Sequence, residues 1–420
     1  MGVEWKRRSD RHAPARTDES LEELAELAAS AGAEIVDRMV QARPAPEAAT
    51  LIGQGKVEEL AAAVLSGPAD VVIFDHDLTP TQQRNLEKAI QAKIIDRTQL
   101  ILDIFASRAH TREGRLQVEL AQLSYMLPRL TGRGVEMSRL GGGIGTRGPG
   151  ETQLETDRRR IKGRIKKIED ELEGVRTGRA LHRRRRTAVP LATLALAGYT
   201  NAGKSTLFNR LTQSGVLVDA RMFATLDPTV RPLILPSRRR VLMSDTVGFI
   251  RNLPTTLVKA FRATLEEVTE AALILHVVDV SAPAAVEHTA HVQQVLGEIG
   301  AAGIPQILVM NKMDRLQAGE GDAENLKRRL TSAGDHPAAR AVAISAATGE
   351  GVDRLLAEVD GALPLDPIVQ TTLRLDAGDG ATLALLHQFG RVLSTRYEGE
   401  LCEVQAEIPE SLKRRLDHRR

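Results

Sequence analysis

Short apolar runs separated by helical stretches open this 420-residue chain. The run EIVDRMV begins at residue 34, DVVIFD at 70 and KIIDR at 93, and each is typical of a buried strand. Before the last run, Thr79 and Pro80 supply an N-cap and a first helical residue. Strands that alternate with helices favour a parallel sheet, so we predict a small α/β domain here.

From about residue 111 the apolar spacing becomes helical. A glycine-rich stretch, GGGIGTRGPGETQ, interrupts it after residue 140. Two amphipathic stripes joined by a loop predict an antiparallel helical hairpin. The stripes consist of Leu116, Leu120, Leu123 and Leu127 in the first helix, and Leu154, Ile161, Ile165, Ile168 and Leu172 in the second.

Buried runs return after residue 190 and alternate with helical stretches. They read LATLALAG, VLMSDT, ALILHVVDV, QILVMN and RAVAIS, and they predict a parallel sheet with helices on its faces. After ALPLDP, the segments IVQTTLRLD, ATLALLHQFG and ELCEVQAEIP predict a strand, a helix and a strand. The fold class is therefore α/β, with a small α+β domain at the C-terminal end.

Positive charge is concentrated in the second helix of the hairpin. Residues 158–186 hold 13 Lys/Arg and four Asp/Glu, a local charge of +9 in a chain whose net charge is +2. A solvated helix face would explain this. Contact with nucleic-acid phosphates also would, because each bound Lys or Arg releases a counterion. We favour nucleic acid, with RNA the natural candidate.

The remaining composition limits the setting. The single cysteine, Cys402, excludes an internal disulfide framework and fits a reducing, cytoplasmic location. No apolar run is long enough to span a bilayer. The first residues, MGVEWKRRSDRHAP, lack the apolar core of a secretory signal, and we expect a disordered tail there.

A phosphate-binding motif follows the first strand after residue 190. GYTNAGKST at 198–206 fits G-x-x-x-x-G-K-S/T between a strand and a helix. Gly198 and Gly203 let backbone amides surround phosphate oxygens. Lys204 supplies charge to the β- and γ-phosphates, and the Ser205 hydroxyl suits Mg²⁺.

Two more motifs lie at strand ends. In DTVG, Asp245 can hold Mg²⁺ through water and the Gly248 amide can meet the γ-phosphate. In NKMD, Asp314 can accept hydrogen bonds from the N1 and N2 edge of guanine, which adenine lacks. Asn311 can tie this loop to the phosphate loop, and the Lys312 stem can cover the base. Together the motifs predict a GTP/GDP site.

The segment RMFATLDPTVR, between these motifs, should be a nucleotide-sensing switch. Thr225 can bind Mg²⁺ through its hydroxyl, and Thr229 is a rival in the same loop. A turn at Asp227-Pro228 favours Thr225. Such a loop orders with GTP and relaxes after hydrolysis. Near the base, an amide within ISA at 344–346 could reach guanine O6.

One position departs from many GTPases. After the glycine of DTVG, where others place a water-positioning glutamine, this chain has Phe249, which cannot hydrogen-bond water. Phe249 also suits a core position that anchors the switch. The catalytic candidates are Lys204, Thr225, Gly248 and Phe249, and the metal ligands are Ser205 and Thr225. The candidate nucleotide-binding residues are Gly198, Tyr199, Thr200, Asn201, Ala202, Gly203, Lys204, Ser205, Thr206, Phe223, Ala224, Thr225, Leu226, Asp227, Asp245, Thr246, Val247, Gly248, Asn311, Lys312, Met313, Asp314, Ser345, Ala346 and Ala347.

With these motifs the chain resembles the HflX family of translation-associated GTPases over roughly residues 30 to 410. The resemblance rests on GYTNAGKSTLFN, FATLDPT, DTVGFI and NKMD, and more specifically on GQGKVEEL at 53–60 and GGGIGTRGPGETQLETDRR at 141–159. It implies a GTPase that binds the large ribosomal subunit near the peptidyl-transferase centre and splits or rescues ribosomes under stress. It also implies Mg²⁺ on Ser205 and Thr225, and a hydrophobic residue in place of the glutamine. Intrinsic hydrolysis should then be slow, with ribosome docking completing the site.

The resemblance also raises ATP binding by the N-terminal domain, because GQGKVEEL places Gly-x-Gly-Lys before a helix. The full P-loop pattern is absent, so we prefer a glycine turn that opens a helix. A nucleotide-regulated RNA-remodelling module, or a tRNA-modification or assembly GTPase, are alternative functions. We expect a monomer with a disordered tail over 1–30, an N-terminal α/β domain over 31–110, a basic helical hairpin over 111–189, a P-loop GTPase domain over 190–364 and a C-terminal domain over 365–420.

Overall fold

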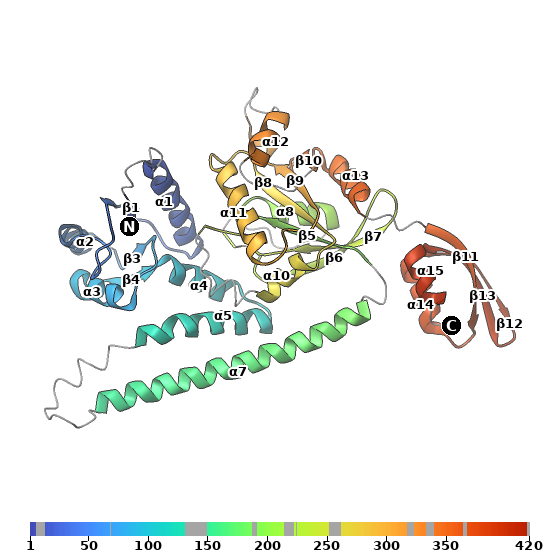
Figure 1. The fold of residues 1–420 in the computed structure, drawn as a ribbon, viewed down its shortest axis with the longest axis horizontal. Coiled ribbons are helices and arrows are strands. Elements are labelled where there is room, and N and C mark those ends of the chain that lie inside the picture. Colours follow the sequence, from blue (N-terminus) through green and yellow to red (C-terminus); the bar gives the residue numbers. More distant parts are fainter. Residues whose placement is uncertain are drawn as a thin grey trace.

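The computed structural model describes most of the chain, in segments. They are residues 1–5, 13–67, 69–130, 149–186, 191–213, 222–223, 225–251, 262–316, 323–332, 340–363 and 368–417. No helix in these segments is both long and apolar enough to cross a membrane. Figure 1 shows an elongated molecule, with the N-terminal elements at one end, a central sheet and a small C-terminal unit at the other end.

The N-terminal sheet is parallel, as predicted. β1 (Gly2–Trp5) pairs with β2 (Val40–Arg43), and β3 (Val71–Phe74) pairs with β4 (Lys93–Asp96). The Met1 amino group donates to Ile73 O at 2.7 Å, and Asp75 N donates to Met1 O at 3.0 Å, so the two pairs are joined. The helices of this region are α2 (Gln54–Ser66), α3 (Pro80–Ile90) and α4 (Arg97–Arg108). α3 begins with the predicted cap, Thr79, in a capping box with Gln82.

Two predictions for this region are wrong. The predicted disordered tail over 1–30 is wrong for the described part of that range, which contains β1 and the helix α1 (Ala13–Ser30). The buried side chains of Leu21, Leu24 and Leu27 recur every third residue and hold α1 in the core. The predicted strand at residues 34–40 is also displaced, since β2 begins only at its last residue.

The helical hairpin is confirmed. α5 (Arg112–Met126) continues into a 3₁₀ turn, η1 (Leu127–Leu130), and lies beside α7 (Pro149–Arg186). Arg164 of α7 meets Glu119 with two hydrogen bonds of 2.7 Å, and Arg112 lies 3.2 Å from Glu171. The earlier residue of α5 pairs with the later residue of α7, so the helices run antiparallel. The glycine-rich loop between them lies outside the described residues.

The central sheet has six strands in the order β10-β9-β8-β5-β7-β6. Five are parallel and match the predicted runs, whereas β6 runs antiparallel to β7 and was not predicted. The strands are β5 (Thr193–Gly198), β6 (Thr229–Ile234), β7 (Arg240–Asp245), β8 (Leu273–Asp279), β9 (Gln306–Asn311) and β10 (Arg340–Ala343); the helical elements are α8 (Lys204–Thr212), α10 (Arg262–Thr269), α11 (Ala285–Glu298), η2 (Met313–Arg315), α12 (Ala323–Ser332) and α13 (Val352–Ala362).

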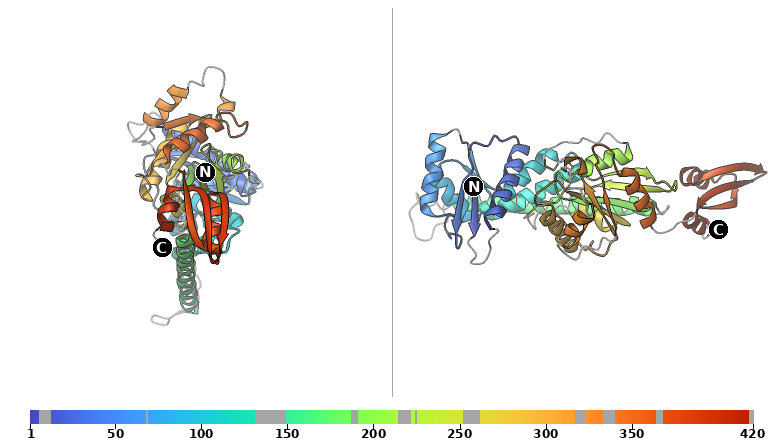
Figure 2. Two further views of the ribbon diagram at one scale, coloured as in Figure 1. Left: turned by 90° about the vertical axis from the view of Figure 1, so that its right-hand side faces the viewer. Right: turned by 90° about the horizontal axis from the view of Figure 1, so that it is seen from above.

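The C-terminal unit has its own sheet and core. Its antiparallel strands have the order β11-β13-β12, and β12 is an addition to the predicted strand, helix and strand. Its buried side chains form a cluster of their own, and Figure 2 shows the unit at the far end from the N-terminal elements. The elements are β11 (Ile368–Asp376), α14 (Gly380–Phe389), β12 (Arg391–Glu398), β13 (Leu401–Pro409) and α15 (Glu410–Asp417).

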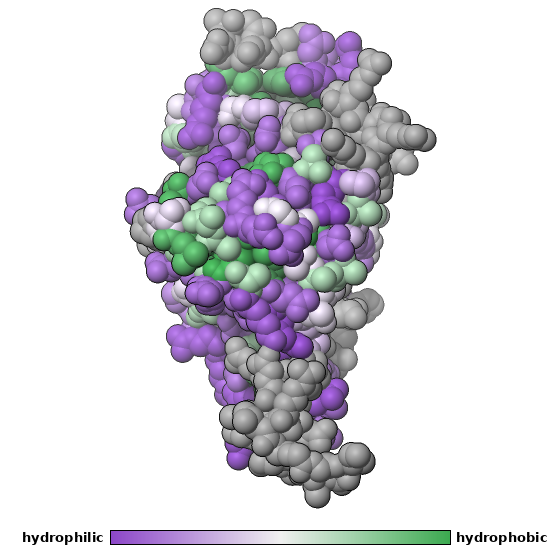
Figure 3. All heavy atoms as spheres, turned by 90° about the vertical axis from the view of Figure 1, so that its left-hand side faces the viewer, coloured by the Kyte–Doolittle hydropathy of each residue, from purple (hydrophilic) through white to green (hydrophobic). Residues whose placement is uncertain are grey.

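The N-terminal region and the central domain, by contrast, share one hydrophobic core. Leu27 of α1 and Phe105 of α4 belong to the same buried cluster as Phe223, Leu226 and Ile250 of the central domain. Burial of this apolar surface on both sides holds the two regions against each other. Figure 3 shows the opposite, outer end of the N-terminal region, where apolar residues form a band flanked by polar ones.

Candidate nucleotide-binding site

A cavity of about 380 Å³ lies at the carboxyl ends of the central parallel strands, where open α/β sheets bind ligands. It is lined by the loops that follow β5, β7, β9 and β10. All its lining residues except Arg315 belong to the predicted set: Thr200, Asn201, Gly203, Lys204, Ser205, Thr206, Phe223, Thr225, Thr246, Gly248, Asn311, Lys312, Asp314, Ala346 and Ala347.

The phosphate loop is fixed by close backbone approaches. A Cβ at Gly198 would lie 2.2 Å from Val277 O, and one at Gly203, where φ is +92°, would lie 2.4 Å from Asn311 Nδ2. Asn311 Nδ2 donates to Ala202 O at 2.8 Å, and its Oδ1 accepts from Ala346 N at 2.9 Å. The predicted link between Asn311 and the phosphate loop is thus confirmed, and Asn311 extends it to the loop after β10.

Lys204 begins α8 beneath this loop. Its ammonium group donates to Gly198 O at 3.1 Å and to Tyr199 O at 2.7 Å. Burial lowers the pKa of Lys204 to about 8, against the opposing influence of Asp245. A bound phosphate would stabilise the protonated form of Lys204, so phosphate binding should raise this pKa again.

Three oxygen ligands converge beside Lys204. Ser205 Oγ lies 2.8 Å from Thr225 Oγ1, and both hydroxyls donate to Asp245 Oδ2, at 2.7 and 3.0 Å respectively. Burial raises the pKa of Asp245, and the hydrogen bond from Ser205 opposes it. Two hydroxyls and a carboxylate are hard oxygen ligands that fit Mg²⁺. The rival Thr229 lies in β6, paired with Asp245 across the sheet, and does not line the cavity.

The other end of the cavity carries the NKMD loop. Asp314 lies in the turn η2, and Lys312, with φ of +67°, forms an ion pair of 2.7 Å with Asp279. Arg210 Nε donates to Ala346 O at 3.1 Å and fixes the neighbouring loop. Ser345 is fully buried, and its amide is used by Glu350 O. The Ala346 amide is likewise used by Asn311, so neither predicted amide is free for guanine O6 without rearrangement.

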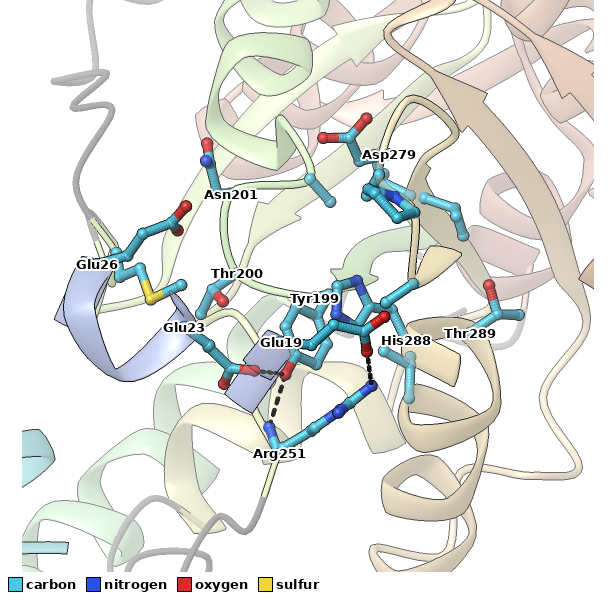
Figure 4. Close-up of a pocket in the computed structure, with 18 of the residues that line it drawn as sticks. Glu19, Glu23, Glu26, Tyr199, Thr200, Asn201, Arg251, Asp279, His288 and Thr289 are labelled. Carbon is cyan, nitrogen blue, oxygen red and sulfur yellow. Dashed lines mark hydrogen bonds and ion pairs between the residues drawn. The ribbon is translucent and has the colours of Figure 1, made fainter. Parts of the chain in front are cut away.

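Tyr199 was predicted to bind nucleotide, but its side chain points away from the cavity. The hydroxyl donates to Glu23 Oε2 of α1 at 2.8 Å and accepts from Arg251 N at 2.9 Å. Its ring stacks on His288, with centroids 3.8 Å apart. Figure 4 shows Tyr199 in a second cavity, of about 210 Å³, between α1 and the central domain. Tyr199 therefore joins the two regions.

Asp227 was also predicted at the nucleotide, but its carboxylate binds the backbone just before α5 and the hydroxyl of Thr111, which is the N-cap of that helix. The carboxylate accepts from His110 N at 3.0 Å, from Thr111 N at 2.9 Å and from the Thr111 hydroxyl. No local sequence pattern predicts this contact, because the partners lie more than a hundred residues apart. Leu226 beside it is buried in the shared core. Ala224 lies outside the described residues.

Phe249 occupies the core position that the sequence allowed. Its side chain is 1% exposed, within the core shared by the two regions. Its backbone exchanges hydrogen bonds with the phosphate loop, from Thr200 N to Phe249 O at 2.8 Å and from Phe249 N to Gly198 O at 3.1 Å. The ring does not line the cavity, so it takes no direct part in the chemistry there. The remaining predicted residues, Ala202, Val247 and Met313, do not line this cavity.

The N-terminal Gly-x-Gly-Lys has the geometry of a turn. Gly53 is the N-cap of α2, and its amide donates to Gln41 Oε1 at 2.9 Å. The Lys56 ammonium pairs with Glu59 at 2.7 Å. The amide and the lysine that a phosphate would need are both occupied.

A six-stranded sheet with a glycine-rich loop on α8, a buried lysine and an oxygen cluster defines a P-loop nucleotide-binding protein. Three family models match: "GTP-binding GTPase N-terminal" over residues 18–106, "GTP-binding GTPase Middle Region" over 108–186 and "50S ribosome-binding GTPase" over 193–312. The chain is 47% identical to the GTPase HflX of Caldanaerobacter subterraneus subsp. tengcongensis over 95% of its length and 90% of that protein's. It is 45% identical to the GTPase HflX of Escherichia coli, covering 88% of this chain and 85% of the other. The chain belongs to the HflX family of GTPases.

Among solved structures, a GTP-binding protein from Sulfolobus solfataricus in complex with GDP is 23% identical, covering 82% of this chain and 95% of its own, with a TM-score of 0.45.

Proposed function

We propose that this GTPase is a nucleotide-controlled switch that binds the large ribosomal subunit through its basic hairpin. We propose further that it splits or rescues ribosomes under stress, in the cytoplasm and as a monomer. The observation that carries the proposal is one short segment. In the segment before β6, Phe223 and Thr225 line the nucleotide cavity, and Met222, Phe223 and Leu226 belong to the hydrophobic core shared with the N-terminal region. A change at the nucleotide can therefore alter contacts with the N-terminal region through this segment.

The contacts of this segment alternate between the two sides. Thr225 reaches the oxygen cluster of the cavity, and Phe223 both lines the cavity and meets the Phe105 ring edge-to-face, with centroids 4.6 Å apart. The Met222 amide donates to Ser30 Oγ at 3.0 Å. Asp227, two residues after Thr225, accepts hydrogen bonds from the amide and the hydroxyl of Thr111, the N-cap residue of the first hairpin helix. Ordering of Thr225 by the nucleotide would thus hold the start of α5.

Within this proposal, the nucleotide is GTP or GDP with Mg²⁺. Ser205 and Thr225 would ligate the ion directly and Asp245 through water; the ion would neutralise charge that develops on the phosphates. Lys204 and the loop amides would bind the β- and γ-phosphates, and Asp314 would select guanine. Because Phe249 lies in the core, we expect slow intrinsic hydrolysis that the ribosomal subunit accelerates.

The exposed charge of α7 fits a phosphate-rich partner. The Arg159 and Arg160 side chains are 80% and 77% exposed and form only long ion pairs, of 3.6 and 3.8 Å. Such pairs contribute little and exchange readily for RNA phosphates. The rival function, RNA remodelling driven by ATP in the N-terminal region, receives no support from the occupied Gly53 and Lys56 groups.

Sedimentation with purified large ribosomal subunits tests the proposal. The chain should co-sediment more tightly with a non-hydrolysable GTP analogue than with GDP, and hydrolysis should be faster with subunits than without. Light scattering of intact ribosomes would then report splitting. Equal sedimentation in all nucleotide states together with equal turnover would contradict the proposal.

A further inference from the structure

Thr200, in the phosphate loop, has a buried hydroxyl with no assigned role. The residue is 6% exposed, and Oγ1 has no hydrogen-bond partner in the described part of the chain. Buried hydroxyls are nearly always hydrogen-bonded, so an orphaned one at a ligand cavity indicates a partner that arrives with the ligand. Thr200 lines the nucleotide cavity and also the second cavity shown in Figure 4, so it stands in the wall between them.

The backbone places Thr200 directly against the γ-phosphate sensor. Its amide donates to Phe249 O at 2.8 Å. A Cβ at Gly248 would lie 2.9 Å from Thr200 Cα, 3.0 Å from its Cγ2 and 2.9 Å from Lys204 Nζ. Thr200 and Lys204 therefore both lie against Gly248, and there is no room for a side chain at position 248.

The neighbouring side chains at this end are already engaged. Ser205 and Thr225 belong to the oxygen cluster around Asp245. Thr246 Oγ1 donates to Leu196 O at 2.6 Å. Phe249, which follows Gly248, turns its ring into the core. Thr200 is thus a residue beside Gly248 whose hydroxyl has no hydrogen-bond partner in the described part of the chain.

We propose that the Thr200 hydroxyl positions the water that attacks the γ-phosphate, and so performs part of the work of the absent glutamine. The inference rests on the GTPase site described above. The water oxygen bonds to the γ-phosphorus, the bond from phosphorus to the β,γ-bridging oxygen breaks, and the water proton leaves with inorganic phosphate. Thr200 gives or accepts one hydrogen bond and keeps its own proton.

The test compares Thr200→Val, which removes the hydroxyl at nearly constant shape, with Thr200→Ser, which keeps it. Single-turnover GTP hydrolysis is measured with and without large ribosomal subunits. Thr200→Val should lower the hydrolysis rate by about tenfold or more, as expected for the loss of one positioned hydrogen-bonding group. Its affinity for GDP and for a non-hydrolysable GTP analogue should stay within about twofold, and Thr200→Ser should recover most of the rate.

A thermal melt of the nucleotide-free protein separates this role from a structural one. Since the hydroxyl has no partner in the described residues, Thr200→Val should melt at the same temperature or higher. Thr200→Ala, checked for intact GDP binding, repeats the kinetic test should the valine be poorly accommodated. Wild-type turnover in both variants would overturn the inference, and so would a loss of GTP-analogue affinity equal to the loss of rate.

The two proposals fail separately. If the wild-type chain does not bind the subunits but Thr200→Val still slows hydrolysis, the ribosomal function is wrong and the inference stands. If subunit binding responds to nucleotide normally while Thr200→Val hydrolyses GTP at the wild-type rate, only the inference is wrong.

Discussion

The two ends of the nucleotide cavity are held by different parts of the molecule. At the base end, Asn311 joins the phosphate loop, the NKMD loop and the loop after β10, all within the central domain. At the γ-phosphate end, the N-terminal region holds the segment before β6 through three contacts: Ser30 with Met222, Phe105 with Phe223, and Thr111 with Asp227. Under the proposed function the two ends have different tasks: the base is recognised within the central domain, and the third phosphate is sensed by a segment that also contacts the N-terminal region.

Lys204→Ala should have the largest effect and should weaken nucleotide binding at both ends. Removal of a buried cation that pairs with phosphate should cost about a hundredfold or more in affinity for GTP and GDP. Calorimetry measures this directly. Lys56→Ala, whose ammonium pairs with Glu59, is the matched control. Retained GTP affinity in Lys204→Ala, or an equal loss in Lys56→Ala, would contradict the assignment.

Asp314→Asn should act only at the base end. The amide cannot accept from both N1 and N2 of guanine, so GTP affinity should fall about tenfold to a hundredfold, and xanthosine nucleotides should compete better. A competition assay against labelled GDP measures the preference. The dependence of subunit binding on the third phosphate should survive when a xanthosine nucleotide is supplied. An unchanged preference for guanine would show that Asp314 does not read the base.

Asp227→Ala should affect only the γ-phosphate end of the cavity. Loss of the hydrogen bonds from His110 and Thr111 costs about 1 kcal/mol, so the ratio of subunit affinities between the GTP-analogue and GDP states should shrink about fivefold. Nucleotide affinity should change little, because the carboxylate does not line the cavity. Asp227→Asn retains an acceptor oxygen and serves as the control. If Asp227→Ala leaves the ratio of subunit affinities unchanged, the contact between Asp227 and Thr111 does not couple the nucleotide state to subunit binding.

A smaller effect is expected from pH. Burial lowers the pKa of Lys204 to about 8, and a bound phosphate raises it again, so binding takes up a proton where the free lysine is deprotonated. Affinity should therefore be full well below pH 8 and fall as pH rises through 8, by about threefold between pH 7.5 and 8.5. Calorimetry in two buffers of different ionisation heat measures the proton uptake. No uptake near pH 8 would indicate that Lys204 stays charged without nucleotide.

The sequence could predict the base end of the cavity better than the γ-phosphate end. GYTNAGKST, DTVG and NKMD work through backbone turns and local charge, and their residues line one cavity as expected. Asp227 looked like a turn residue because its partners, at 110 and 111, are close only in the folded chain. β6 was missed because Pro232 weakens its strand pattern, and the antiparallel edge position of β6 is where proline is tolerated.

The N-terminal region was underestimated for a similar reason. The basic, polar first residues predict disorder. The leucines of α1 are buried only because they pack into the core shared with the central domain. Tyr199 likewise lies within a phosphate-binding motif, yet its hydroxyl contacts Glu23 of α1. Local motifs define loop geometry, and contacts between distant segments decide which way their side chains point.

The contact between Asp227 and the start of α5 depends on Gly114. A Cβ at Gly114 would lie 2.3 Å from Asp227 Oδ1, so the carboxylate can seat itself there only while residue 114 has no side chain. A single methyl group at that point would displace the carboxylate without entering the nucleotide cavity. Such a protein should still hydrolyse GTP, but the nucleotide state should no longer affect the N-terminal region. Gly114→Ala would then separate hydrolysis from the response of the hairpin.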